Sequence, residues 1–404
     1  NDMTNDEKWF EKKMDRREFL KKAGIGGAGL ALGVSGASAF FANKAQEEKK
    51  ISDGGEEISF YGEHQAGITT PMQKNIYFVV LDLHSTDKEE VIQMFKDWTD
   101  YSSKLVDGEL VKKDGSNALL PPSDTGETVG LNPYRLTLTF GVSADFLKKM
   151  GLEKKRPKEF RDLPPFPKEQ LQEKYTGGDI VIQACADDEQ VAFHAVRNLV
   201  RKARNTVTMK WSQSGFAAIG DRMSTPRNLF GFKDGTANVT KEKDFDKVIW
   251  TESDDWMNGG TYLAVRRIQM FLETWDRTNL QEQENTFGRY KESGAPFGKK
   301  DEFDEVDLDL LPVDSHVRLA KEVNKPIYRR SYSYSDGIVE KTGQFDTGLL
   351  FLAFQKNPDS FVKVQTNLGA QDKMNEYVTH IGSGLFACFA GVKKGEYLGQ
   401  KLFE

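Results

Sequence analysis

Cysteine and histidine are scarce in this sequence, and their scarcity excludes several kinds of site. The 404 residues include two cysteines, Cys185 and Cys388, and five histidines. Neither cysteine belongs to a C-x-x-C or C-x-x-C-H motif, so the sequence predicts no disulfide framework, no zinc knuckle and no covalently attached prosthetic group. Each cysteine lies in an apolar run, which favours a small buried side chain over a reactive thiol.

A strong charge of either sign is also missing. The net charge is -6, and charged residues make up 29% of the chain against 38% hydrophobic residues. This composition is typical of a soluble globular protein. Binding to nucleic acid needs clustered lysine and arginine to neutralise phosphates, so we expect no nucleic-acid partner. The length suggests two domains.

The N-terminal residues resemble an export signal. Residues 15–21 read D-R-R-E-F-L-K, which is similar to the twin-arginine signature with aspartate where serine or threonine is usual. An uncharged, glycine-rich stretch follows over 23–42 and contains an A-x-A-like cleavage site. About 20 uncharged residues would also suit a single membrane anchor, but the glycines make a poor helix. We therefore expect a twin-arginine signal segment over 1–42, a linker over 43–57, and a periplasmic, cell-surface or secreted protein.

Apolar periodicity over the remaining chain predicts two similar halves. In the first half we expect strands at 76–83, 136–140 and 180–185, and helices around 91–98 and 191–200. In the second half we expect strands at 261–270 and 348–355, and a helix around 361–368. Strands interrupted by helices without regular β-α-β alternation favour antiparallel sheets. The predicted fold is α+β, with two ferredoxin-like domains (dimeric α/β-barrel type) at 58–225 and 226–404.

A long connection is expected in the second half. Residues 284–311 are rich in glycine and then in acidic residues. Connections of this length are usually functional or mobile. We therefore expect this excursion to lie near the site of the second domain.

The five histidines leave few candidates for a metal ligand. His194 falls inside an apolar helical pattern, where a core histidine is the more frequent role. His84 and His380 have no partner nearby in sequence, and His64 lies in an unusual glycine-containing patch that could border a cofactor. His316 is the best single candidate.

Two further patches contain polar residues that chemistry could use. In residues 227–238 two glycines, Gly231 and Gly235, bracket Asp234, so the backbone can turn sharply and present one carboxylate to a flat ligand. A plain β-turn would explain the same pattern. In residues 328–337, Arg329 and Arg330 lie among tyrosines, and the alternative there is an exposed strand with ordinary surface charge.

These motifs, in this order, resemble the haem-site signature of DyP-type (dye-decolorising) peroxidases. The G-x-x-D-G motif at 231–235, His316 and the following Arg329 carry the resemblance. It extends from about residue 58 to the C-terminus, with further similar patches at 62–68, 177–179, 288–296, 350–355 and 397–400. These patches look like the export-tagged branch of the family, which includes deferrochelatase/peroxidase proteins.

The resemblance implies a haem b in the C-terminal half, held non-covalently and present once per chain. His316 would be the proximal ligand of the haem iron, with its other ring nitrogen held by an acceptor that the sequence does not identify. Gly235, Thr236 and Ala237 would contact the haem, and Arg329 would lie against it.

The same resemblance implies how peroxide is handled. Asp234 would move a proton between the two oxygens of bound hydrogen peroxide, and Arg329 would stabilise the charge that builds as the O–O bond breaks. We prefer Arg329 to Arg330 because one guanidinium fork has to face the peroxide. Tyr332 and Tyr334 could relay electrons to large substrates, but a role as core aromatic residues is favoured.

Two function hypotheses share this site. The first is a peroxidase that uses hydrogen peroxide to oxidise a reducing substrate such as a dye, a phenol or ferrous iron. The second is a haem-binding, iron-releasing (deferrochelatase) protein of an iron-acquisition system, with membrane and binding-protein partners. Asp234 together with Arg329 favours the first, because a carrier needs no proton-transfer pair. An exported α+β protein without a cofactor is a third reading, which the full set of motifs disfavours. A homo-oligomer is compatible with each of them.

Overall fold

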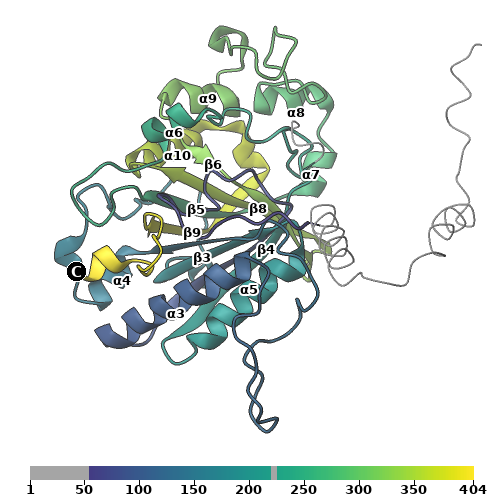
Figure 1. Ribbon diagram of the computed structural model, residues 1–404. Coiled ribbons are helices and arrows are strands. Elements are labelled where there is room, and N and C mark those ends of the chain that lie inside the picture. Colours follow the sequence, from purple (N-terminus) through teal and green to yellow (C-terminus); the bar gives the residue numbers. More distant parts are fainter. Residues whose placement is uncertain (1–53, 220–224) are drawn as a thin grey trace, which may run out of the picture. The chain divides into compact units, whose positions relative to one another are not determined.

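The apolar runs of the sequence form the strands of an antiparallel sheet (Figure 1). The computed structural model describes residues 54–219 and 225–404. The strands in these ranges are β1 Asn75–Leu83, β2 Thr137–Val142, β3 Ile180–Ala186, β4 Val207–Phe216, β5 Thr261–Met270, β6 Tyr328–Arg329, β7 Tyr332–Val339, β8 Gln344–Gln355 and β9 Val378–Cys388. The predicted signal segment and most of the predicted linker lie outside the described residues.

The strand order closes the sheet into a ring. The order is β5-β9-β2-β3-β1-β4-β7-β8-β6, and β5 also pairs with β8. Within the ring, β4-β1-β3-β2 and β9-β5-β8-β7 are two antiparallel four-stranded sheets with the same order of strands. The joints between them are narrow: β2 meets β9 through two residue pairs, and β4 meets β7 through one. This arrangement of two ferredoxin-like units confirms the predicted fold class.

Helices cover the outer faces of the two sheets (Figure 1). α3 (Lys88–Val106) and α5 (Glu189–Lys202) lie against the first sheet, while α9 (His316–Val323) and α10 (Asp359–Gln371) belong to the layer beside the second sheet. The shorter helices are α4 Ala144–Lys149, α6 Glu242–Val248, α7 Leu272–Asp276, α8 Leu280–Phe287 and α11 Gln400–Phe403. In the described part of the chain, no helix has the length and apolar character needed to cross a membrane.

Two apolar cores follow from this layering. One lies between the first sheet and α3 with α5, and it includes Phe95, Trp98 and Ile182, all fully buried. The other lies between the two sheets and joins Phe78 of β1 to Leu352 of β8. Full burial of a side chain of this size contributes about 1.5–3 kcal/mol. Since the second core draws on both halves, the halves stabilise one another.

Local sequence signals explain where the main helices begin. Asp87 precedes α3, and its side chain accepts hydrogen bonds from the backbone N–H groups of Glu89 and Glu90. Asp188 precedes α5 and accepts from the N–H of Val191. These aspartates satisfy donors that a helix start leaves unpaired.

Most of the predicted elements are present, and two long strands were not predicted. The five predicted strands fall within or overlap β1, β2, β3, β5 and β8, and the predicted helices fall within α3, α5 and α10. β4 and β9 were missed, and β7 was offered only as the alternative of an exposed strand over 328–337. Cys185 and Cys388 are free and buried, as expected. The domain boundaries at 58–225 and 226–404 stay a prediction, because residues 54 onward belong to one compact unit.

Candidate active site

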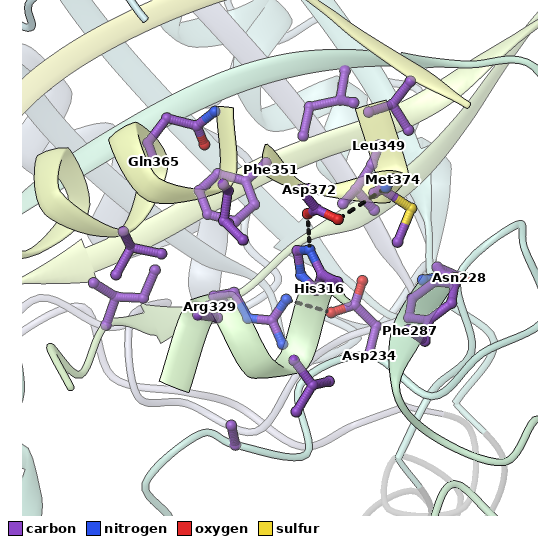
Figure 2. Close-up of a pocket in the computed structure, with 18 of the residues that line it drawn as sticks. Asn228, Asp234, Phe287, His316, Arg329, Leu349, Phe351, Gln365, Asp372 and Met374 are labelled. Carbon is purple, nitrogen blue, oxygen red and sulfur yellow. Dashed lines mark hydrogen bonds and ion pairs between the residues drawn. The ribbon is translucent and has the colours of Figure 1, made fainter. Parts of the chain in front are cut away.

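A cavity of about 400 Å³ lies between the second sheet and the helices that cover it (Figure 2). This volume is typical of a small-molecule or cofactor site. Most of its wall is apolar and consists of Ile268, Met270, Phe287, Leu349, Phe351, Phe361, Val364, Leu368 and Val378. Every residue that lines it belongs to the second half of the chain.

His316 is the first residue of α9 and faces this cavity. Its Nδ1 lies 2.6 Å from Oδ2 of Asp372, which follows α10 and is buried (Figure 2). The other carboxylate oxygen of Asp372 accepts the backbone N–H of Met374 at 2.8 Å. Both oxygens are thus held, and Nε2 of His316 is left as the ring nitrogen available to a ligand.

Asp372 is the acceptor that the sequence did not identify. It follows an amphipathic helix, where an aspartate is an ordinary cap of the next turn. Nothing in its spacing connects it to a histidine 56 positions earlier. Only the packing of α10 against α9 brings the two side chains together.

Asp234 and Arg329 form an ion pair in the same cavity, with Nη1 of Arg329 2.9 Å from Oδ1 of Asp234 (Figure 2). Asp234 lies in a tight loop in which Gly231 and Gly235 have φ values of 83° and 103°. Such values strain other L-residues, so the glycines of the motif are required for this turn. Both charged side chains are partly accessible from the cavity.

Asn238 connects the loop that carries Asp234 to the backbone of Arg329. Its side-chain N–H donates to the backbone carbonyl of Arg329 at 2.6 Å, and its side-chain oxygen accepts the backbone N–H of Arg329 at 2.9 Å. The Asp234 loop is therefore fastened to β6 much as a neighbouring strand would be. The sequence alone gave Asn238 no role.

The neighbouring arginine points elsewhere. Arg330 is buried, and its guanidinium donates to the carbonyl of Thr70 and to Oε1 of Gln73. Successive residues of an extended chain face opposite sides, so only one of the pair can reach Asp234. The geometry places Arg329 there. Tyr332 and Tyr334 are fully buried core residues.

Of the three residues that follow Asp234, two line the main cavity and one does not. Thr236 and Ala237 line it. Gly235 borders instead an adjoining cavity of about 390 Å³, to which Asp234 and Arg329 also belong. The excursion predicted at 284–311 does reach the site, since Arg289 lines the main cavity.

The other histidines have different surroundings. His194 is buried and lies 2.8 Å from Asp124, which fits the predicted core role. His84 bonds to Thr208. His64 stacks on Trp250 at a centroid distance of 3.8 Å, and none of residues 61–68 lines the main cavity, so the idea that this patch borders a cofactor there is not supported.

His380, which had no role in the sequence, does line the cavity. Burial and the nearby Arg266 and His316 lower the pKa of His380 to about 3. Its imidazole is therefore neutral near pH 7. It adds a polar but uncharged group to a mainly apolar wall.

The donor set at His316 fits a haem. Among residues 54–219 and 225–404, no group of three or more His, Cys, Asp or Glu side chains could hold a metal ion. A metal at Nε2 of His316 would take its other ligands from a molecule that arrives with it, as a porphyrin supplies four nitrogens. A single histidine backed by a carboxylate, in a mainly apolar cavity, is a typical haem setting.

The comparisons with known proteins agree with this geometry. The family profile for the N-terminal part of Dyp-type peroxidases matches residues 65–217, and the profile for the C-terminal part matches 225–393. A deferrochelatase of Shigella sonnei is 36% identical over an alignment of 414 positions, gaps included, that covers 96% of each chain. A deferrochelatase of Escherichia coli O157:H7 is 37% identical over an alignment of 412 positions with the same coverage.

Solved structures agree as well. Ferric DtpA from Streptomyces lividans superposes with a TM-score of 0.81 at 36% identity, over 87% of this chain and 98% of that one. A DyP-type peroxidase from Cellulomonas bogoriensis gives a TM-score of 0.80 at 34% identity, over 87% and 99%. The matching profiles cover both halves, and the cavity has the expected histidine, aspartate and arginine. The chain therefore belongs to the DyP-type peroxidase family and is a haem-dependent peroxidase.

Proposed function

We propose that this protein binds one haem b per chain, non-covalently, in the cavity at His316, and uses hydrogen peroxide to oxidise dyes, phenols or ferrous iron. The observation that carries the proposal is the ion pair of Asp234 and Arg329 in the same cavity as His316. A bound haem would supply an iron centre that hydrogen peroxide can oxidise by two electrons and that a reductant can restore one electron at a time.

His316 would hold the iron through Nε2. The carboxylate of Asp372 accepts the proton on Nδ1, which fixes the tautomer and the direction of the ring and makes Nε2 a stronger donor. Thr236 and Ala237 would contact the macrocycle. The cations Arg289, Lys321 and Lys325 also line the cavity and suit the two carboxylates of a haem b.

Asp234 would take the proton from the oxygen of peroxide nearer the iron and return it to the other oxygen, which leaves as water. The guanidinium of Arg329 lies 2.9 Å from the carboxylate of Asp234 and would hold it in place for this transfer. It would also stabilise negative charge on the departing oxygen. Asn238 keeps the two groups together by holding the backbone of Arg329.

The experiment that tests the proposal combines a spectrum with rapid mixing. The purified protein should show a strong Soret band, and His316→Ala should lose or loosen the haem. After mixing with hydrogen peroxide, the rate of change of the visible spectrum should fall about 10²–10³-fold in Asp234→Asn and in Arg329→Leu. Exposed Arg277→Leu serves as a control. Parent-like rates in both site variants would defeat the proposed roles.

Iron release from haem is the second candidate function. The relatives named deferrochelatase match nearly the full length of the chain, which favours this alternative. It predicts that incubation with haem under reducing conditions gives fluorescent, iron-free porphyrin. Peroxidase turnover without any such fluorescence would leave the first function alone.

The location and the partners of the protein are part of the same proposal. The twin-arginine-like motif at 15–21 supports export to the periplasm, the cell surface or the medium in the folded, haem-loaded state. Membrane and binding components of an iron-uptake system, and a second copy of this chain, are the proposed partners. Replacing Arg16 and Arg17 by lysine should retain the protein in the cytoplasm, which fractionation of cells would measure.

A further inference from the structure

A buried carboxylate outside the motif holds the residues on both sides of Asp234. Glu302 lies in the long segment between α8 and α9 and is 8% exposed. One carboxylate oxygen pairs with Nζ of Lys233, and the other accepts the hydroxyl of Thr236 at 2.7 Å. The carboxylate thus bridges a short stretch of chain in which Asp234 lies.

The segment that carries Glu302 is itself fixed. The guanidinium of Arg289 donates to the carbonyl of Glu302 at 2.9 Å and to the carbonyl of Gly294 at 2.8 Å. A Cβ atom at Gly294 would lie 2.7 Å from Cδ of Lys233, so the segment packs directly on the lysine stem. The backbone at Glu302 is therefore held by Arg289, and its side chain extends from there to the Asp234 loop.

Other contacts hold the Asp234 loop before the aspartate: Phe232 is buried and stacks on Phe287, and Arg227 donates to the carbonyl of Gly231. Both bracketing glycines have positive φ, and glycine leaves the backbone free to adopt other conformations. The backbone N–H of Asp234 donates to the carbonyl of Pro226, and Asn238 fastens the far end of the loop. The contacts of Lys233 and Thr236 with Glu302 add a link on each side of Asp234 to the segment between α8 and α9.

We infer that Glu302 is a positioning residue for Asp234: its carboxylate spans Lys233 and Thr236 and so fixes where the catalytic carboxylate points and which charges it meets. The inference rests on the proposed function, in which Asp234 carries the proton. Proton transfer depends steeply on position, and a displacement of about 1 Å can cost up to about 100-fold in rate.

Charge is the second part of the role. Burial by itself would raise the pKa of Glu302, but hydrogen bonds from Lys233, Thr225 and Thr236 outweigh it, so the pKa lies below its ordinary value. The ionised carboxylate neutralises Lys233. Asp234 pairs with Arg329, and Glu302 neutralises Lys233. The other charged or titratable groups that line the same cavity are Arg289, Lys321, Lys325, His316, Asp372 and His380.

Removing the negative charge would leave the ammonium of Lys233, which lines the same cavity as Asp234, without its counter-charge. A free cation nearby favours the ionised form of a carboxylate and lowers its pKa. With Asp234 as the proton carrier, the acid limb of the peroxide reaction should then move to lower pH. A residue that only stabilised the fold would not move this limb.

The test measures the rate of spectral change of the haem-loaded protein with hydrogen peroxide between pH 3 and pH 8. In Glu302→Gln we expect a rate about tenfold lower at pH 7 and an acid limb lower by about 0.5–1 pH unit. The matched control is Glu305→Gln, an exposed glutamate of the same segment, which should stay within about twofold of the parent. In an Asp234→Asn background, Glu302→Gln should cause no further loss, because the two residues act as one unit.

Glu302→Gln leaves Lys233 without its counter-charge and could fail to fold. The double variant Lys233→Gln/Glu302→Gln avoids this, since two amides can bond to each other. It should fold, recover most of the rate and return the acid limb to the parent position. An acid limb that stays shifted in the double variant would overturn the charge argument.

Two outcomes separate this inference from the proposed function. If Asp234→Asn is slow while Glu302→Gln matches the parent in rate and acid limb, the inference fails and the proposed function stands. The inference also fails alone if Glu302→Gln causes the same loss with and without Asp234. If Asp234→Asn reacts at the parent rate, the proposed function fails and the inference fails with it.

Discussion

Arg329 and Arg330 are neighbours with opposite surroundings, and this difference can be measured. Arg330 is buried and supplies the donors for the carbonyl of Thr70 and for Gln73. Arg329 is partly accessible and pairs with Asp234. One arginine therefore serves the fold, and the other is proposed to serve the reaction.

We expect Arg330→Leu to lower the free energy of unfolding by about 1–3 kcal/mol, because it leaves buried acceptors without donors. Arg329→Leu should change it by less than about 1 kcal/mol, since a partly exposed ion pair contributes little. Guanidinium unfolding of both variants, alongside peroxide kinetics, checks the contrast. The reverse pattern, with Arg329 decisive for stability, would contradict it.

Asp372 is predicted to control how firmly the haem is held. In Asp372→Asn the weaker acceptor should reduce the donor strength of His316 and lower haem affinity about 10–100-fold. The rate of haem transfer to an excess of a haem-accepting apoprotein, followed at the Soret band, measures this. Asp359→Asn, an exposed change at the first residue of α10, is the control. Equal transfer rates in both variants would contradict the prediction.

The sequence identified the residues of this site that belong to a motif and missed those that act through the fold. Asp234, His316 and Arg329 have recognisable neighbours in sequence, so the family signature found them. Asp372 and Asn238 bond to partners 56 and 91 positions away. Their own neighbourhoods look like ordinary helix caps and turns, and only tertiary packing gives them a role.

At the scale of elements, the segment 107–132 between α3 and β2 is fastened along α5. Asp124 accepts hydrogen bonds from His194 and from the backbone N–H groups of Val111 and Gly126. Burial by itself would raise the pKa of Asp124, but these hydrogen bonds outweigh it, so the pKa lies below its ordinary value of 3.8. The ionised form is the one that holds the segment in place.

A depressed folded pKa contributes stability that is complete above the unfolded value and is lost as the pH falls through the folded value. Above pH 3.8 we therefore expect the amides of Val111 and Gly126 to exchange with solvent about tenfold more slowly in the parent than in Asp124→Asn. At lower pH the two proteins should converge. Hydrogen exchange at matched pH measures the difference, with Asp145→Asn, an exposed change on α4, as a control. A difference that persisted unchanged well below pH 3 would contradict the assignment.

β9 explains why some strands escaped prediction. It contains Gly382 and Gly384 and has two polar residues, Thr379 and His380, near its start, which is unlike a typical strand pattern. A Cβ at Gly382 would lie 2.8 Å from the carbonyl of Tyr175 and 2.9 Å from Cβ of Arg267. The glycine is needed because two other segments approach the strand closely, and this crowding exists only in the folded ring. β5, by contrast, is apolar and buried along most of its length, and its bounds were predicted correctly.

For the whole molecule, closure of the sheet couples the two halves. The core between the sheets combines Ile76 and Phe78 of β1 with Val265 and Leu350 of the second sheet. Without the other sheet, the apolar face of each sheet would be exposed to water. The fold class followed from the sequence because each half has its own periodicity, but the ring did not, since its joints involve only three residue pairs.

We therefore expect one cooperative unfolding transition in guanidinium, coincident by far-UV circular dichroism and tryptophan fluorescence, in the haem-free protein. Haem should raise the midpoint without splitting the transition, because a ligand of the native state stabilises all of it. A fragment ending at residue 225 should be unfolded or aggregated when made alone. Two separated transitions would show that the halves are independent.

All the residues that line the main cavity lie between 228 and 380, whereas α3 and α5 cover the other side of the molecule (Figure 1). Substitutions on the outer surface of α3 and α5 can therefore change which partners bind there without altering the residues of the cavity. Members of the family can therefore differ in location and in binding partners while the residues that react with peroxide stay the same.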